Sequence, residues 1–373
     1  MGYQYWSYET LDSLCKDSFV KFGFTEKEAK IITDVLLMSD LYGIESHGMQ
    51  RLDRYYKSIQ KGMILVEKKG EVVFETPVSA VIDGQDGMGQ IVAHKAMEMA
   101  IQKAKTCGIG MVTVRNSNHY GIAGYYAKMA CDQGLIGISC TNTNPILVPT
   151  YGRTAMLGTN PIAVAMPAEP YDFFFDASTS VVTRGKLEVY NKAGKELHEG
   201  WALDKDGHPS TDAADVLGNI VAHKGGGIMP LGGSTEDTGS HKGYGYAMLC
   251  EIFSSIISMG TTSDKTGRNG RGLICHGFVA IDPNIFGDAQ AIKAHLSAYL
   301  EDLRNAPKAD GQTRIYTHGE KEAEAKKRIL EEGIPVNDNT MLEILDLCNY
   351  LQMDFSKYFG DYQPPKSDYK SLY

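Results

Sequence analysis

The sequence predicts a mixed α/β protein of the α+β kind, and three observations lead to that prediction. The N-terminal stretch carries helix signals, residues 79–133 alternate strand and helix, and residues 136–190 are dense in short strands. Strands so closely spaced along the chain leave no room for a crossover helix between each pair. Much of the sheet is therefore expected to be antiparallel.

Helix signals open the chain. Thr25 and Glu28 form a capping box ahead of an apolar face that runs to Gly43. A second apolar stripe, at 52–59, follows Gly48. The N-terminal segment is therefore predicted to be helical.

The remaining elements follow from hydrophobic periodicity and turn residues. The tyrosine-rich tail from Tyr358 to Tyr373 lacks helical periodicity and is expected to lie over a neighbour. The expected strands are 79–82, 109–114, 136–140, 162–166, 173–175, 186–190 and 278–281, and the expected helices are 90–105, 122–133, 243–259, 285–304, 319–333 and 341–351.

Length, charge and cysteine usage exclude several classes of protein. The chain has 373 residues, 43% of them hydrophobic, which suits a globular protein of two or three domains. Its net charge of −9 disfavours nucleic acid and anionic membranes as partners. No apolar run of about 18 residues occurs, and the N-terminus lacks a secretory pattern, so we expect a cytoplasmic protein. The seven cysteines show no zinc spacing, and no metal is expected.

The usual dinucleotide fingerprint is not met. Gly87-Met88-Gly89 follows a predicted strand, but bulky Val92 stands at the third glycine position, and no acidic residue lies between Glu98 and Asp132. Neither a P-loop nor an HExxH motif is present. Any nicotinamide chemistry therefore needs a scaffold other than the Rossmann fold.

The segment from Ser46 to Tyr55 is the strongest candidate site. On a helix, His47, Arg51 and Tyr55 would fall within an arc of about 80°. One face would then carry an acid/base, a guanidinium that binds carboxylates through two parallel bonds, and a phenol. The alternative is a solvated helix face with a satisfied histidine.

A second candidate site is the segment from Arg115 to Gly124, which contains His119 and Gly121. It follows a predicted strand and opens a helix, so polar side chains and free amide hydrogens gather at the end of a strand. The alternative is a helix-capping turn rich in Asn and Ser.

Three further polar turns are weaker candidates. Thr159 lies in a turn after a strand, and Asp176 at a strand end would be placed to orient an imidazole. Lys242, near a helix N-terminus, would face a phosphate or carboxylate. The segments of Thr159 and Asp176, each taken alone, are more often ordinary turns, and the Lys242 segment taken alone is a weak signal.

Taken in order, these segments closely resemble the type-2 malate/L-lactate dehydrogenase family, whose relatives include ureidoglycolate and sulfolactate dehydrogenases. The resemblance extends from about residue 10 to about residue 330. The segments that carry it are Leu41–Gly48, Ser117–Gly121, Leu157–Pro161, Asp176–Ser180, Gly200–Asp204, His241–Gly245 and Arg314–Glu320.

The resemblance implies an architecture. A non-Rossmann nucleotide-binding domain with a largely antiparallel sheet would span 111–307. A helical and mixed domain for substrate binding and dimerisation would combine 1–110 with 308–373. The protein would be a homodimer with its active site between the domains.

The resemblance also implies roles for individual residues. His47 beside Ser46 would be catalytic with Asp176 as its orienting partner, although His119 competes with His47 as the proton acceptor. Arg51 and Tyr55 would hold the substrate carboxylate, with Thr159 also in the substrate site. The residues expected to border the cofactor are His119, Gly121, Asp176, Ala177, Ser178, Lys242, Arg314, Gly319 and Glu320.

The expected activity is hydride transfer between nicotinamide and C2 of a small 2-hydroxy acid. NAD is the expected cofactor, with NADP left open. Malate, lactate, ureidoglycolate and sulfolactate all remain open as substrates. A hypothesis of a different class is an inactive homologue that only binds a small acid.

Overall fold

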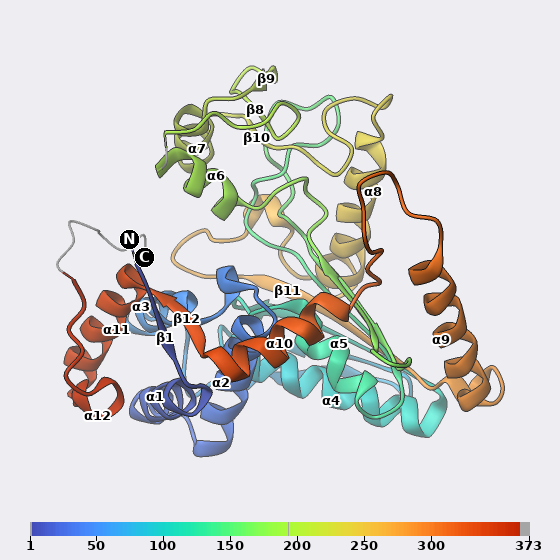
Figure 1. Cartoon of the computed structure of the whole chain (residues 1–373), viewed down its shortest axis with the longest axis horizontal. Coiled ribbons are helices and arrows are strands. Elements are labelled where there is room, and N and C mark those ends of the chain that lie inside the picture. Colours follow the sequence, from blue (N-terminus) through green and yellow to red (C-terminus); the bar gives the residue numbers. More distant parts are fainter. Residues whose placement is uncertain (1, 193, 366–373) are drawn as a thin grey trace.

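A seven-stranded mixed sheet is the centre of the fold (Figure 1). The computed structural model describes residues 2–192 and 194–365. The strand order is β2-β3-β4-β11-β5-β6-β7, and among the described strands of this sheet only β3 and β4 pair in parallel. The prediction of a largely antiparallel sheet is therefore confirmed. The strands are β2 (Glu71–Glu75), β3 (Ser79–Asp83), β4 (Ile109–Ser117), β5 (Ile136–Thr141), β6 (Ile162–Met166), β7 (Phe173–Ala177) and β11 (Ile274–Ile281).

Helices cover both faces of this sheet. Helices α4 (Gly89–Cys107) and α5 (Ala123–Cys131) pack on one face, where small alanines allow them to approach closely. Helix α8 (Ser240–Glu251) continues into a π-helical turn, η3 (Ile252–Ile256), which contacts the opposite face. The long helix predicted at 243–259 is therefore two segments of different winding.

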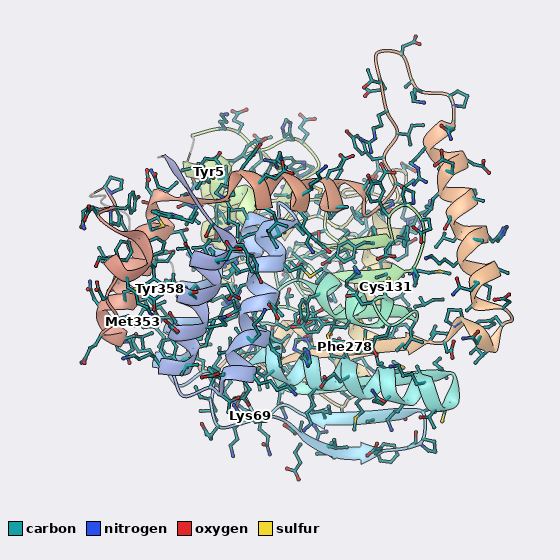
Figure 2. All side chains as sticks on the ribbon, turned by 60° about the horizontal axis from the view of Figure 1, so that its bottom comes forward. Tyr5, Lys69, Cys131, Phe278, Met353 and Tyr358 are labelled. Carbon is teal, nitrogen blue, oxygen red and sulfur yellow. The ribbon has the colours of Figure 1, made fainter. Side chains whose placement is uncertain are left out.

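The two ends of the chain build one helical layer. Strand β1 (Tyr3–Trp6) pairs antiparallel with β12 (Ile334–Asn337), and a single apolar cluster joins residues 11–91 with residues 329–359. Figure 2 shows α1 and α2 side by side, with Met353 and Tyr358 next to them. The helices of this layer are α1 (Tyr8–Lys21), α2 (Glu26–Leu41), α3 (Leu52–Gln60), α10 (Glu320–Glu332), α11 (Asp338–Leu351) and α12 (Ser356–Phe359).

Two details of this layer can be compared with the predictions from the sequence. The capping box is confirmed, because Glu28 N donates to Thr25 Oγ1 (3.3 Å) and Thr25 N donates to the Glu28 carboxylate (2.9 Å). The tail contains the short helix α12, which was missed, and its described part packs on the chain's own N-terminus: Tyr358 donates to Asp17 and the ring of Tyr362 lies on Trp6. Tyr369 and Tyr373 lie outside the described residues.

A small second unit lies above the main sheet (Figure 1). It holds a three-stranded sheet, two helices and an apolar cluster of its own. The strand predicted at 186–190 is wrong, because Leu187 is fully buried and Arg184 pairs with Glu188 one helical turn away, which is helical spacing. The elements are α6 (Arg184–Lys192), β8 (Ala202–Leu203), β9 (Pro209–Ser210), α7 (Ala213–Ala222) and β10 (Gly227–Ile228).

The connection back to the helical layer runs through α9 (Ala289–Asn305), which stands at the right of Figure 1. The predicted division of the chain at residue 110 stays a prediction, and the main sheet runs across it, since β3 pairs with β4. No helix within residues 2–192 and 194–365 is long and apolar enough to cross a membrane.

Candidate active site

The turn that carries His119 is fixed to a distant segment by Asn118. Its side-chain amide donates to the carbonyl oxygens of Met63 (3.2 Å), Asp86 (3.0 Å) and Gly87 (3.1 Å). The turn lies between the end of β4 and the start of α5, as the sequence predicted. One buried amide therefore determines where the loop 117–122 places its imidazole.

His119 itself is held on one ring nitrogen. Its Nδ1 lies 2.7 Å from the hydroxyl of Tyr55 and 3.3 Å from the backbone N–H of Gly121. The ring of Tyr120, the next residue in the turn, stacks on buried His276 with a centroid distance of 4.2 Å. Because Nδ1 is engaged in these contacts, Nε2 is the nitrogen left for a ligand.

The turn that carries His47 differs from the predicted helix. Two 3-10 turns, Glu45–His47 (η1) and Met49–Arg51 (η2), meet at Gly48, and α3 begins only at Leu52. The prediction that one continuous helix carries His47, Arg51 and Tyr55 is therefore wrong.

Asp40 is the physical reason for this break. Its buried carboxyl accepts a hydrogen bond from Met49 N (2.8 Å), and a Cβ at position 48 would come within 1.9 Å of Asp40 Oδ1. The chain is thus pulled away from helical geometry at Gly48. The resulting path still stacks the ring of His47 on that of His119, with centroids 5.6 Å apart and planes 22° apart.

Two arginines flank this imidazole pair. Arg51 Nε donates to the carbonyl oxygen of Ser46 (2.6 Å), and Ser46 Oγ lies 2.9 Å from His47 Nδ1. Arg54, three residues further, lies on α3 and lines a cavity together with His119. Sequence reasoning assigned a role to Arg51 and missed Arg54, although the short spacing between them was a usable signal.

Both imidazoles are held in the neutral form. Burial lowers the pKa of His47 to about 3, and the charges of Arg51 and Arg54 act in the same direction. Burial likewise lowers the pKa of His119 well below its usual range, followed by the charges of Arg54, His47 and Arg51. A neutral imidazole is the form that accepts a proton.

A cavity of about 250 Å³ opens at His119. Its size suits a small organic acid rather than a large ligand. His119, Tyr55 and Arg54 lie on its wall, whereas His47 and Arg51 are not among its lining residues. The other lining residues are Lys57, Ser58, Lys61, Met63, Ile64, Asn118, Asn144, Gly267, Gly272 and Ile274.

Asp176 lies beside the start of α5. Its carboxylate accepts a hydrogen bond from Gly124 N (2.7 Å), and burial raises its pKa to about 6. Within the described part of the chain it makes no hydrogen bond to His47 or His119. The predicted orienting contact is therefore not formed in this structure.

Thr159 ties the next turn to the same region. Its carbonyl oxygen accepts from the backbone N–H (2.9 Å) and the hydroxyl (3.0 Å) of Thr179, and its own N–H donates to Thr143 Oγ1 (3.0 Å). Ala177 and Ser178 directly precede Thr179, and Asn144 on the cavity wall directly follows Thr143.

The start of α8 adjoins this turn as well. Leu231 N donates to the carbonyl oxygen of Thr179 (3.0 Å), and the backbone of Gly243 packs on Leu231. No side chain caps α8, exposed Lys242 lies in its first turn, and its N-cap is Gly239, with φ of +89°. An uncapped helix start with a lysine is a donor set that suits a phosphate group.

The Arg314–Glu320 stretch lies along β7, where His318 O accepts from Phe174 N (3.2 Å). Glu320 is completely buried and binds Arg304, Arg314 and Thr317. Glu320 therefore stabilises the loop. Arg314 is exposed and remains in reach of a ligand.

The chain is similar to several known dehydrogenases. A family model described as malate/L-lactate dehydrogenase matches residues 6–345. The malate dehydrogenase of Pyrococcus horikoshii is 44% identical over 331 residues, covering 88% of this chain and 90% of that one. The L-sulfolactate dehydrogenase of Methanocaldococcus jannaschii is 39% identical over 357 residues, covering 94% and 98%. The crystal structure of malate dehydrogenase from Entamoeba histolytica superposes with a TM-score of 0.90 at 35% identity, covering 95% and 99%.

Proposed function

The chain belongs to the malate/L-lactate dehydrogenase family, and from that premise we propose that His119 and its cavity exchange a proton with a small 2-hydroxy acid during nicotinamide-dependent oxidation. The observation that carries the proposal is the cavity itself. It brings one imidazole nitrogen, a phenol and a guanidinium together in a volume that suits such an acid.

Residues outside the cavity, on the segments that the sequence assigned to the cofactor, suit a nicotinamide dinucleotide. The uncapped start of α8 with Lys242 would hold the pyrophosphate, and Gly121, Asp176, Ala177 and Ser178 would border the nicotinamide half. When bound, the cofactor accepts or donates the hydride. Arg314 and Gly319 would border its remaining portion, and Glu320 would act through Arg314.

We assign the proton to His119 rather than His47. His119 lines the cavity, and its neutral ring can take a proton at Nε2 while Nδ1–H donates to the hydroxyl of Tyr55, a hydrogen bond that the protonated ring keeps. His47, bonded to Ser46, would tune that ring through their stack. Arg51 does not line the cavity in this structure, so it would turn from Ser46 to hold the carboxylate at C1, with the C2 hydrogen then facing the nicotinamide and Thr159 bordering the substrate.

NAD is the proposed cofactor. The guanidinium of Arg314 lies 2.9 Å from Glu320 and 2.7 Å from Glu324, so two carboxylates offset its charge. A 2′-phosphate would meet little net positive charge there. The expected result is a kcat/KM for NADH above that for NADPH, and the reverse order would overturn the assignment.

We propose a homodimer that uses the outer face of α8 and η3. Five large apolar side chains at helical spacing are exposed along it, which a stable solvent-facing helix would not carry. This stripe lies in the segment expected to bind nucleotide, not in the one expected to dimerise. Light scattering should give a dimer, and Phe253→Glu should give a monomer; a monomeric unaltered protein would contradict the proposal. The stripe consists of Tyr246, Leu249, Phe253, Ile256 and Ile257.

The activity is tested with a panel of 2-oxo acids and both reduced cofactors, followed by the near-ultraviolet absorbance of the reduced nicotinamide. We expect turnover with at least one acid and its loss in His119→Asn. If no acid is reduced with either cofactor, an acid-binding homologue without activity is the better description.

A further inference from the structure

Glu251 is an acidic side chain buried at the end of α8. It is the last residue of that helix, just before the π-helical turn η3, and only 2% of it is exposed. Within residues 2–192 and 194–365 the partners of its carboxyl group are neutral hydrogen-bond donors, with no cation among them. A carboxyl group at this depth is costly to bury unless hydrogen bonds satisfy it. The donors therefore show which parts of the chain this side chain holds together.

Two loops outside α8 donate to this carboxyl group. Asn160, in the turn before β6, donates from its side-chain amide (3.1 Å). Ser263, which begins the 3-10 turn η4 (Ser263–Lys265), donates from its backbone N–H (3.3 Å) and from its hydroxyl. Ser255, in η3, also donates its hydroxyl (2.5 Å), and Asn142 lies at the limit of hydrogen-bond distance (3.5 Å). The carboxyl group thus joins the end of α8 to two loops that are distant in the sequence.

Both loops continue into the wall of the cavity. The side-chain oxygen of Asn160 accepts from Thr143 N (3.1 Å), and Asn144, the next residue, lines the cavity. Thr266, which follows η4, places its hydroxyl 3.1 Å from Asn144 Oδ1, and Gly267, the next residue, also lines the cavity. A Cβ at position 267 would come within 3.0 Å of Asn144 Oδ1, so the two wall residues lie against each other. The contacts of Glu251 therefore lead to two adjoining positions on the wall.

Glu251 is not bonded to the turn that carries His119. In the described part of the chain, none of its hydrogen bonds goes to His119 or to the two residues that support it, Asn118 and Tyr55. These supports hold the imidazole through contacts of their own. A change at Glu251 is therefore expected to move the cavity wall and to leave the imidazole in place.

Resting on the proposed function, we propose that Glu251 is a positioning residue for acid binding. Its carboxyl group holds the loops of Asn160 and Ser263 at the spacing that brings Asn144 and Gly267 together on the cavity wall. Glu251 does not line the cavity itself. Its effect is therefore on the affinity for the acid and not on the proton-transfer step.

The test compares two serines that donate a hydroxyl to the same carboxyl group. Ser263 belongs to a loop that continues to the wall, whereas Ser255 belongs to η3 and donates within its own helical segment. Both serines are fully buried, so Ser263→Ala and Ser255→Ala form a matched pair. With the best acid of the panel, Ser263→Ala should raise KM about 10-fold with kcat within about 2-fold, and Ser255→Ala should leave KM unchanged. Glu251→Gln, which keeps the size of the side chain, should raise KM at least as much as Ser263→Ala.

A role in stability alone predicts a different result. Both serine variants would then lose melting temperature and active enzyme to a similar extent, while KM would stay the same. Equal KM values in Ser263→Ala, Ser255→Ala and the unaltered enzyme would overturn the proposal. An equal rise of KM in both variants, or a loss of kcat alone, would overturn it as well.

Crystal structures of the two serine variants separate this proposal from the proposed function, because they require neither turnover nor a bound acid. Displacement of Asn144 and Gly267 in Ser263→Ala, with both residues in place in Ser255→Ala, would support the positioning role even in a protein that reduces no acid. An unmoved wall in both variants would refute that role even in an active enzyme.

Discussion

The turn that carries His47 and the turn that carries His119 present the same side chain by different means. Asn118 ties the His119 turn to three carbonyl oxygens of a distant segment, and Tyr55 holds its ring from outside the turn. The His47 turn depends on local contacts instead, with Ser46 on the ring and Asp40 on the backbone.

The difference between the two turns suggests different roles for the two stacked imidazoles in proton transfer. Both are kept neutral by burial and by nearby guanidiniums. Only His119 lines the cavity, so it is placed to meet a substrate oxygen, while His47 is placed to act on His119. Substitutions in each of the two turns test this division of roles.

The largest effect is expected from His119→Asn. Loss of the proton carrier should lower kcat by about 10³-fold, whereas His47→Asn should lower it by only about 10-fold. Steady-state kinetics in both directions with the preferred acid measures the two values. If His47→Asn proves the more damaging variant while both proteins melt at the same temperature, the roles are reversed.

Gly48→Ala tests the backbone of the His47 turn. The added methyl group would come within 1.9 Å of the Asp40 carboxyl, so we expect a loss of about 3 kcal/mol in the free energy of unfolding by urea. Gly218→Ala is the matched control, because nothing lies within 4 Å of that position in α7. A neutral Gly48→Ala would show that Asp40 does not determine the path of the turn.

His276→Phe tests the support under the His119 turn. Burial lowers the pKa of His276 from 6.5 to about 3, so its contribution to stability is complete above pH 6.5 and is lost as the pH falls toward 3. The unaltered protein should lose about 2 kcal/mol between pH 6.5 and pH 5 through this residue. His276→Phe should remove that part of the slope, and exposed His295→Phe should not. Identical slopes in all three proteins would show that His276 does not titrate on unfolding.

The sequence predicted the sheet better than it predicted the site. Strand spacing alone indicated antiparallel pairing. Parallel neighbours need a long crossover connection, and the connections in this part of the sequence are too short to hold one. The Ser46–Tyr55 segment was found, but its helix was not, because the carboxyl of Asp40 overrides local helical periodicity at Gly48. The hydrogen bond from Met49 to Asp40, nine positions apart in the sequence, left no periodic signal.

Arg54 was missed for a related reason. Helical spacing from His47 favours Arg51 as the residue on the same face. The helix is interrupted at Gly48, however, and it is Arg54 that lines the cavity. The 186–190 helix was misassigned because its apolar residues suited a strand as well as a helix. The segment is a helix, α6, that packs against α7, and this contact cannot be predicted from a short window of sequence.

The smallest effects are expected from removing the hydroxyl group that contacts each imidazole, and they compare the two turns directly. Tyr55→Phe removes the hydroxyl from His119 Nδ1, and Ser46→Ala removes the hydroxyl from His47 Nδ1. Since a hydrogen bond to a catalytic imidazole contributes about 1.4 kcal/mol, Tyr55→Phe should lower kcat/KM about 10-fold in both directions. Ser46→Ala should lower it less, because His47 acts on the substrate only through His119. A larger loss in Ser46→Ala than in Tyr55→Phe would place the proton on His47, even though His47 does not line the cavity.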